Sequence, residues 1–421
     1  MNAITNSTVD NKFSHWYLFL LSPFIAGLMA VKNYKSGWAK NILWGFIVFY
    51  GFTLGISKET SNNADISRYI YELKQMYQKN LSLGQVADLY QNNKDIDIAR
   101  LTIVITVSRF TDYAPILTAI YGLIFGFFFS RNVWFILDRL KGKIKPLTIL
   151  FLITFILVNP FWNINGFRFY TAAQVFIYGL LPFLFDGKKK GILISSLSFL
   201  VHFSFLLPIM VLFVYIIFGN RTIIYFAFFL ASTVVSEIEI GRFNSFVDAN
   251  TPKALSERTS VYRSDRYVNE YRTGTESFVQ NSSWHAKYYM KALNWALTAL
   301  LILLFFKRKV LLHMSKQLRN SLCFTLLIWG FANVLSSLPS GGRYYTIAYL
   351  SLLPLIIFYI HYINVNRFSN RLTTLAIPFL LFFCIVAARE GLYTLTLNTF
   401  ISNPLVAIFA DYSFSINDFI K

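Results

Sequence analysis

The sequence predicts an all-α, polytopic membrane protein of about 12 transmembrane helices, arranged as a single transmembrane domain over residues 1–421. Two observations predict this class. First, 55% of the 421 residues are hydrophobic and only 14% are charged, and the apolar runs recur at the length that a bilayer crossing needs. Second, the connections on one side of these runs hold 19 of the 39 Lys and Arg residues but only two of the 20 acids. Such an asymmetry is typical of cytoplasmic loops, so the membrane explains the net charge of +19 without a nucleic-acid partner.

The predicted spans follow the apolar runs in chain order. The first run continues past Ser22 and Pro23 without a small-residue cleavage site, so we expect a retained helix and not a signal peptide. The predicted spans are 15–31, 41–57, 114–130, 147–160, 166–185, 191–203, 204–218, 222–236, 288–306, 321–337, 343–362 and 373–388.

A re-entrant or broken helical hairpin is predicted near 191–218. A single long helix over this range would place the basic cluster at 307–309 outside and the mixed-charge stretch 237–287 inside, against the charge rule. Two half-spans that turn near His202 place the basic cluster inside and the stretch 237–287 outside, in agreement with the charge rule. Each half is shorter than the roughly 20 residues of a full crossing, so the turn is expected within the membrane, where it lines a cavity.

Two long polar stretches are predicted on the outer face. The first periplasmic loop, 58–113, is expected to contain an amphipathic helix from Asp65 and an interfacial helix over the apolar run at 101–107. The second periplasmic loop, 237–287, mixes tyrosines with arginines and is expected to cap the outer face, where such side chains suit sugars or phosphates. The alternative is a solvated loop held by salt bridges. The weakly amphipathic segment 391–421 fits either an outer-face helix or one last crossing.

The sequence has no motif for nucleotide-driven or metal-centred chemistry. It lacks a Gly-rich phosphate loop, an HExxH pair and a nucleophile elbow, and its five histidines have no metal-ligand spacing. The two cysteines, Cys323 and Cys384, both lie in apolar runs, which argues against a disulfide framework or a thiolate metal site. We therefore expect neither a metal nor a cofactor.

Arginines near the outer half of the membrane are the first candidate site residues. Arg168 lies inside an apolar run, and intramembrane charges are functional candidates by default; the alternative is that it snorkels to the interface. Arg343 follows Ser-Gly-Gly at a helix start, where amides and a guanidinium suit a phosphate; the alternative is a tight turn with an interface anchor. Arg68 joins them, with Arg109 and Arg263 as weaker members.

Asp65 and His202 are the candidate general bases that would remove a proton from an attacking hydroxyl. For Asp65 the alternative role is the N-cap of the helix that follows it. For His202 the alternative is a buried histidine that a neighbouring carbonyl or Ser204 satisfies. An arginine cluster beside such a base suits a lipid diphosphate, because preorganised positive groups stabilise the departing charge without a metal.

The order of these motifs resembles the EpsG-like family of Wzy-type polysaccharide polymerases, which act on O-antigen, capsule or exopolysaccharide repeat units. In the resemblance, family members often have Arg-Gln at the start of one helix, whereas here Phe follows Arg168 and the nearest glutamine is Gln174. The matching motifs cover most of the membrane domain. They are Asp65-x-x-x-Tyr69, the Arg168 helix GFRFYTAAQVFIYGLL, a Lys-rich turn, FLVHFSFLLP around His202, and SGGRYYTIAYL around Arg343.

The resemblance implies a multi-pass enzyme of the bacterial inner membrane whose active site faces the periplasm or the outside. It would transfer a growing glycan from polyprenyl diphosphate to the non-reducing end of another lipid-linked repeat unit, with a chain-length regulator as a further partner. The implied roles are diphosphate binding for Arg168 and Arg343, binding of a sugar or second phosphate for Arg68 and Arg263, and general base for His202 or Asp65.

Other functions share many of these features. A membrane glycan ligase or a polyprenyl-phosphate-dependent glycosyltransferase differs mainly in acceptor or donor, and a lipid-linked oligosaccharide flippase is a transporter. A flippase predicts charges spread through the bilayer from both sides and an internal repeat, whereas here the intramembrane charges gather toward one side. We therefore rank the polymerase first, the ligase or other transferase second and the flippase third.

Overall fold

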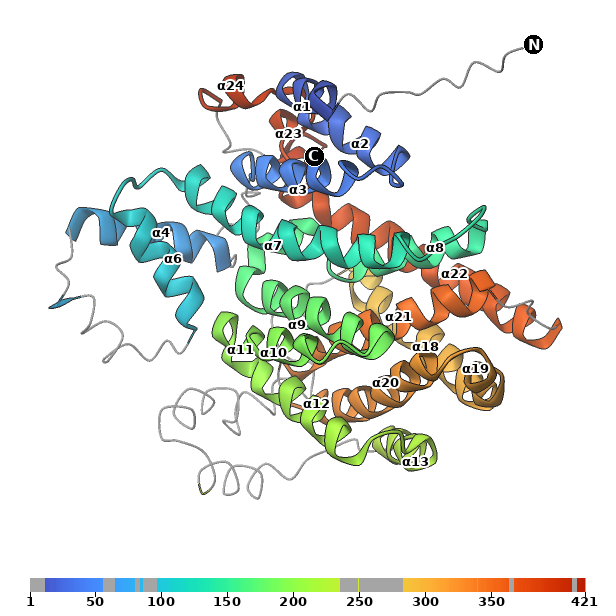
Figure 1. Ribbon diagram of the computed structural model, residues 1–421. Coiled ribbons are helices and arrows are strands. Elements are labelled where there is room, and N and C mark those ends of the chain that lie inside the picture. Colours follow the sequence, from blue (N-terminus) through green and yellow to red (C-terminus); the bar gives the residue numbers. More distant parts are fainter. Residues whose placement is uncertain are drawn as a thin grey trace, which may run out of the picture.

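A computed structural model describes the chain over residues 12–55, 65–79, 84–85, 97–234, 249, 283–338, 340–362, 367–410 and 415–420. These residues form helices joined by turns, and no strand occurs among them. The predicted all-α class is therefore confirmed. Figure 1 shows the helices packed in a bundle, with α4 (Asp65–Lys79) and α6 (Ile98–Ser108) projecting together from one side.

Among the described residues, six helical segments are long and apolar enough to cross a membrane, which supports the membrane class. The short helix α19 (Arg308–Met314) links two of them. The segments comprise α7 (Ala114–Leu137), the run from α8 (Pro146–Val158) through η1 (Phe161–Gly166) to α9 (Phe167–Asp186), α18 (Trp284–Phe306), α20 (Lys316–Leu335), η4 (Gly341–Tyr344) with α21 (Tyr345–Tyr362), and α22 (Arg367–Glu390).

The predicted number of twelve spans is not confirmed, because several apolar runs contain breaks that hydropathy does not register. At 15–31, Ser22 adopts an extended conformation and Pro23 follows it, so the run forms two helices of 10 residues each. The shorter helices in predicted spans are α1 (Lys12–Leu21), α2 (Pro23–Lys32), α3 (Ala39–Phe52), α10 (Lys190–Ser196), α11 (Ser198–Val201), α12 (Leu206–Phe218) and α13 (Thr222–Ser232).

α21 lies at the centre of the bundle. Of its apolar window 94% is buried, against 39% to 72% for the other span-length segments. α8 packs on α21, and a break at Pro160 separates α8 from η1 and α9. Buried amides brace this break: Asn159 donates to the Tyr170 carbonyl at 2.9 Å, and Gln174 donates to the Asn159 carbonyl at 3.2 Å. Gln174 therefore fixes the start of α9.

Residues 190–218 form a hairpin of short helices. Its first arm, α10, runs antiparallel to α9. In α9, Gly179 packs directly against Gly191 of α10. Closer to the start of α9, the Phe176 carbonyl accepts a hydrogen bond at 2.8 Å from the hydroxyl of Ser195, which lies later in α10. The first arm therefore returns along α9 toward the start of that helix.

The hairpin reverses at His202, whose extended backbone (φ −150°, ψ 119°) ends α11. α12 then runs parallel to α9, since the ring centres of Phe205 and Phe169 are 5.3 Å apart and those of Tyr215 and Phe183 are 6.4 Å apart. The two ends of the hairpin therefore lie at the same end of the bundle. This turn agrees with the predicted hairpin, and its depth in a bilayer stays a prediction.

The open ends of the hairpin lie among other basic connections. Arg139, after α7, pairs with Asp186 at the end of α9, with 2.8 Å between Nη2 and Oδ1. Lys145, before α8, donates to the Ile360 carbonyl near the end of α21 at 2.9 Å. We call this end of the bundle the basic end. The opposite end, where the hairpin turns, is called the site end.

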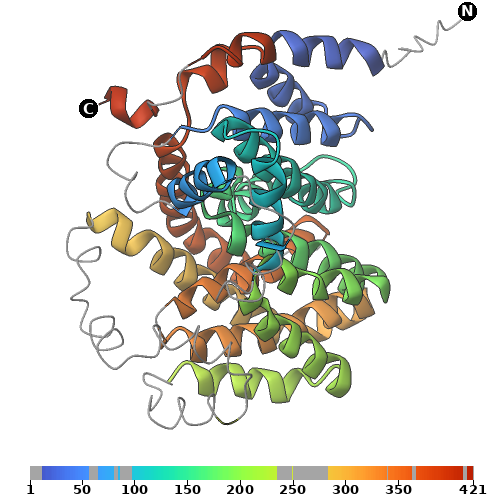
Figure 2. The ribbon, with the colours of Figure 1, turned by 90° about the vertical axis from the view of Figure 1, so that its left-hand side faces the viewer.

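The terminal helices pack together on one side of the bundle, at the top of Figures 1 and 2. Tyr50 of α3 donates to the Thr394 hydroxyl at 2.7 Å, and the Thr53 and Thr399 hydroxyls are 2.9 Å apart. The C-terminal segment forms helices of at most five residues, which are too short to cross a membrane. They are η5 (Gly391–Tyr393), α23 (Leu397–Ile401), α24 (Pro404–Ala407) and α25 (Ile416–Ile420).

The first predicted outer loop forms the two helices that the sequence suggests. α4 begins at Asp65 and buries Ile66, Tyr69 and Leu73, the i, i+3, i+7 stripe of an amphipathic helix. α6 covers the apolar run at 101–107. α4 and α6 pack against each other, and their place at a membrane interface stays a prediction.

The second predicted outer loop lies almost entirely outside the described residues. Residues 235–282 are not described except for residue 249, and α18 begins at Trp284. The expected cap over the outer face and the candidate Arg263 therefore stay predictions from the sequence.

Gly179→Ala is expected to lower the thermal unfolding midpoint of the detergent-purified protein. A Cβ at this position would lie 2.3 Å from the Gly191 carbonyl oxygen and 2.5 Å from the Ser195 nitrogen, so α10 would have to move. Overpacking of this kind typically costs about 1–3 kcal/mol. Gly37→Ala is the matched control, since nothing lies within 4 Å of a Cβ there. Equal midpoints for the two variants would contradict the close contact of α9 and α10.

Candidate functional site

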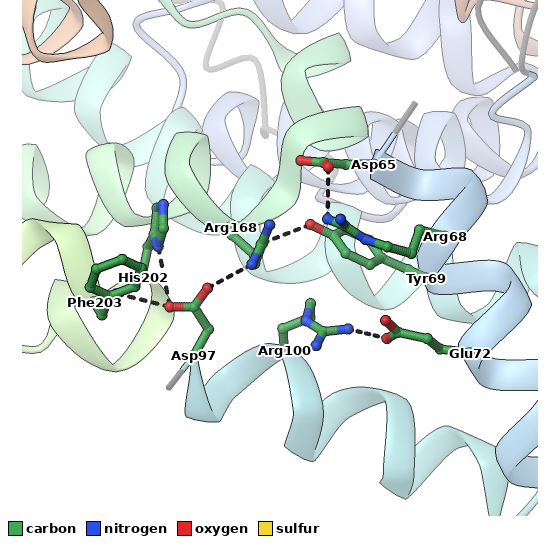
Figure 3. Close-up of polar contacts among 9 residues, drawn as sticks. All are labelled: Asp65, Arg68, Tyr69, Glu72, Asp97, Arg100, Arg168, His202 and Phe203. Carbon is green, nitrogen blue, oxygen red and sulfur yellow. Dashed lines mark hydrogen bonds and ion pairs between the residues drawn. The ribbon is translucent and has the colours of Figure 1, made fainter. Parts of the chain in front are cut away.

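Asp97 is the centre of a polar cluster at the site end (Figure 3). Its side chain is fully buried, and it directly precedes α6. One carboxylate oxygen accepts a hydrogen bond from Arg168 Nη1 at 3.0 Å. The other lies 3.2 Å from His202 Nδ1 and accepts the Phe203 backbone N–H at 2.9 Å. Because an ionised carboxylate can only accept, Nδ1 is the donor, and in the neutral ring Nε2 carries the lone pair.

The surroundings of Asp97 keep it ionised. Burial by itself would raise the pKa of its carboxyl group, since burial disfavours the charged form. The hydrogen bonds from His202 and the Phe203 N–H, together with the charge of Arg168, outweigh burial and lower the pKa below its ordinary value. A buried charge of this kind depends on its partners, because removing one leaves the other uncompensated.

Three segments that are distant in the sequence form this cluster. Asp97 is 71 residues from Arg168 and 105 residues from His202. Arg168 projects from the first turn of α9. The reversal at His202 leaves the Phe203 N–H outside the hydrogen bonding of α11, so that it points at the carboxylate. The break in the hairpin thus supplies a donor that a continuous helix would have used internally.

Tyr69 connects this cluster to α4. Its buried hydroxyl accepts a hydrogen bond from Arg168 Nε at 2.9 Å, and burial raises the pKa of the phenol, so it stays protonated. The guanidinium carbons of Arg68, Arg100 and Arg168 lie 5.6, 5.1 and 5.9 Å from the centre of its ring. Arg100 also forms an ion pair with Glu72. These contacts hold the first predicted outer loop against the start of α9.

Asp65 and Arg68 form a separate and more exposed ion pair. Arg68 Nη2 lies 2.9 Å from Asp65 Oδ1, and the side chains are 54% and 43% exposed, respectively. Asp65 is the first residue of α4, where an acid is favourable to the helix dipole. Its position therefore agrees with the alternative structural role at the helix start, and it already has a partner of opposite charge.

A cavity of about 620 Å³ lies at the same end of the bundle. It is enclosed by the run from α8 to α9, the first turns of α18, the start of α21 and the last turns of α22. Aromatic and amide side chains make up much of its wall, among them Trp162, Asn163, Tyr170 and Asn294. Its charged lining residues are Lys287, Lys291, Arg343 and Glu390.

Gly341 sets the position of Arg343 in this wall. A Cβ at Gly341 would lie 1.8 Å from the Leu335 carbonyl oxygen, so only glycine fits against the end of α20. Ser340, just before it, has a positive φ of 61°. The Ser-Gly-Gly motif is therefore a tight turn, and the same turn places Arg343 in the cavity lining.

Arg168 and Arg343 lie in different parts of the site end. Arg168 is bound to Asp97 and is not among the lining residues of the cavity, whereas Tyr170 is. Side chains at i and i+2 of a helix point about 200° apart. The first turn of α9 therefore directs Arg168 to one side and Tyr170 to the other.

Tyr344 joins these two parts. It follows Arg343, and its hydroxyl donates to the Ser204 carbonyl at 3.0 Å, just after the turn at His202. The ring of Phe169 packs against both sides, with its centre 5.9 Å from that of His202 and 6.2 Å from that of Tyr344. Tyr344, next to Arg343 of the cavity wall, and Phe169 thus bridge the cavity and the Asp97 cluster.

Sequence reasoning selected Arg168 and His202 but missed Asp97, which joins them. Asp97 lies in the polar stretch NNKDIDIAR, two residues after another acid, and the local pattern does not distinguish the two. Its place just before an apolar helix suggests an N-cap, yet its side chain makes no capping bond. Lys287 and Lys291 were missed because they fall at the boundary between a predicted loop and a predicted span.

The part of the chain that the structure describes contains no group of three His, Cys, Asp or Glu side chains that could hold a metal ion. Cys323 and Cys384 are buried free thiols. Comparison with known proteins gives no relative: no family model, no curated protein and no solved structure matches this chain. The function is therefore argued from the chemistry of the site.

Asp97→Ala is expected to destabilise the protein by about 3–5 kcal/mol, because it leaves Arg168 largely buried without its counter-charge. Asp65→Ala, in the exposed pair, should cost less than about 1 kcal/mol. Thermal unfolding of the detergent-purified variants measures both effects. The double variant Asp97→Leu with Arg168→Met removes both charges and should recover most of the loss. If the double variant were as unstable as Asp97→Ala, the instability would not come from the uncompensated charge of Arg168.

Proposed function

We propose that this chain is a polysaccharide repeat-unit polymerase, a membrane glycosyltransferase that moves a growing glycan from polyprenyl diphosphate onto the non-reducing end of another lipid-linked repeat unit. One observation carries the proposal. His202 is held through Nδ1 by the buried, ionised Asp97, the arrangement of a general base. The nearby cavity has three cations among its four charged lining residues, and Phe169 and Tyr344 lie between His202 and this cavity.

The proposed reaction is a displacement at the anomeric carbon of the donor. A hydroxyl of the acceptor sugar forms the new C–O bond as the bond to the diphosphate breaks, and the bonding electrons leave with the polyprenyl diphosphate. His202 Nε2 takes the hydroxyl proton, and Asp97 stabilises the imidazolium that results. Preorganised cations stabilise the charge on the departing diphosphate, so this scheme requires no metal.

The geometry favours His202 over Asp65 as the base. Asp97 orients the His202 ring and fixes its tautomer, as the third group of a catalytic triad does. Asp65 is well exposed and paired with Arg68, and no third group orients its carboxylate toward a substrate among the contacts of the described residues. Arg168 then acts as a positioning residue, because it binds the other oxygen of the Asp97 carboxylate.

The remaining sequence-predicted residues concern the substrate. In this proposal Arg343, which lines the cavity, binds the diphosphate of the donor. Arg68, more than half exposed on α4, stays a candidate for contact with a sugar or second phosphate. Six span-length helices support a location in a membrane, which we propose to be the bacterial inner membrane with the site end toward the periplasm or outside. A chain-length regulator stays a proposed partner.

Deletion of the gene is expected to collapse long surface polysaccharide to single repeat units. Only the wild-type gene should restore the ladder; His202→Ala and Arg168→Ala should not, since loss of a general base typically costs about 10²–10⁴-fold in rate. The measurement is the length distribution of surface and lipid-linked glycan, at protein levels matched by immunoblot. His15→Ala, on α1, is the control histidine variant and should restore the ladder.

Each other outcome identifies a different function or residue. Repeat units that accumulate at the cytoplasmic face would indicate a flippase. Unchanged chain length with a lost substituent or final attachment would indicate a ligase or another transferase. Full restoration of the ladder by His202→Ala would remove His202 as the base, even if the deletion itself gave the expected collapse.

A further inference from the structure

The cations that line the cavity lack acidic partners in the part of the chain that the structure describes. No ion pair or side-chain hydrogen bond joins Lys287, Lys291 or Arg343 to any described acid. The cavity therefore holds three cationic side chains and one acidic side chain, Glu390. Such an excess of positive charge in a concave, partly apolar site attracts an anionic ligand.

The two lysines reach the cavity from one helix face. Lys287, Lys291 and Asn294 lie at i, i+4 and i+7 in the first turns of α18, so their side chains share one side of that helix. Arg343 approaches from the turn before α21, on a different part of the wall. A ligand between α18 and α21 would thus meet cations from two directions.

Arg168 differs from these cations in its electrostatic state. Its guanidinium is bound to the fully buried carboxylate of Asp97 and to the Tyr69 hydroxyl, and it does not line the cavity. Its charge is therefore already compensated inside the protein. An incoming diphosphate gains most from cations that no carboxylate neutralises.

We propose that Lys287, Lys291 and Arg343 form a diphosphate-binding site and that Arg168 is not part of it. This rests on the proposed function and deepens it, because it assigns the diphosphate of the donor to a set of residues of which the sequence suggested only Arg343. Three cations match the charge of a diphosphate ester better than that of a monophosphate. The planar guanidinium binds two oxygens at once, while each lysine acts as a point charge.

The rest of the cavity suits a sugar attached to that diphosphate. Trp162, Tyr170 and Tyr289 offer aromatic faces, and Asn163 offers amide hydrogen bonds. The Glu390 carboxylate can accept hydrogen bonds from sugar hydroxyls, which a site for bare diphosphate would not need. The ligand class is therefore a glycosyl diphosphate.

The test measures binding to the purified protein in nanodiscs of neutral lipid. Farnesyl diphosphate, inorganic pyrophosphate, inorganic phosphate and phosphatidylglycerol are titrated separately, and binding is followed by microscale thermophoresis. Farnesyl diphosphate and pyrophosphate are expected to bind at least tenfold more tightly than phosphate, with an affinity that falls as salt increases. Lys287→Ala with Lys291→Ala, and Arg343→Ala separately, should each weaken diphosphate binding at least tenfold.

Two controls separate this site from general effects of charge. Lys74→Ala with Lys79→Ala removes two lysines from exposed positions on α4 and should leave binding within about twofold of wild type. The charge-balanced variant Asp97→Leu with Arg168→Met should also keep diphosphate binding within about threefold. Loss of binding in this variant at an unchanged unfolding midpoint would overturn the exclusion of Arg168.

Two further outcomes of the binding assay would overturn the proposed site or its ligand class. Wild-type affinity in the double lysine variant would overturn the proposed site. Equal affinity for phosphate and diphosphate, or tight binding of phosphatidylglycerol alone, would overturn the diphosphate assignment and indicate a general anion site or a phospholipid headgroup site. The binding assay does not depend on chain extension, so the two proposals can fail separately. If the lysines bind diphosphate but deletion of the gene leaves the polysaccharide ladder intact, the polymerase function is refuted and the diphosphate site is not.

Discussion

The ionised carboxylate of Asp97 is the constraint on which the site end depends. A fully buried charge is stable only where several groups compensate it, and here Arg168, His202 and the Phe203 N–H do so together. Asp97 lies just before α6, and these groups come from the start of α9 and the turn of the hairpin. A single carboxylate therefore determines how three separate segments meet. The break at His202 serves the same purpose, because it frees the Phe203 N–H to compensate the buried charge.

Two kinds of positive charge follow from this arrangement. Arg168 is compensated and largely buried, so its role is to hold other groups in place. Lys287 and Lys291 line a cavity without an acidic partner among the described residues, so their charge is available to a ligand. This difference matters more than the number of arginines, because a neutralised guanidinium offers little attraction to a second anion.

Sequence reasoning predicted the helical membrane class, the start of α4 at Asp65 and a turn near His202, since each depends on local pattern or charge parity. The predicted number of twelve spans is not confirmed, because a break such as that at Ser22 depends on backbone conformation and not on hydropathy. Asp97 was not predicted, because its partners lie 71 and 105 residues away and only the packed fold brings them together. Arg168 was selected for its cost in an apolar run, but its partner Asp97 could not be identified from the sequence.

The separation of the Asp97 cluster from the cavity has a chemical reason in the proposed reaction. A displacement needs a negative, proton-accepting centre on the acceptor side and positive charge on the leaving-group side. If the Asp97 carboxylate lay in the cavity wall, it would cancel one of the cations that a departing diphosphate needs. The first turn of α9 avoids this by directing Arg168 toward Asp97 and Tyr170 toward the cavity. The hydrogen bond from Tyr344 to Ser204 links the segments that carry the two centres. In the proposed reaction, opposite charges would then act on one substrate without neutralising each other.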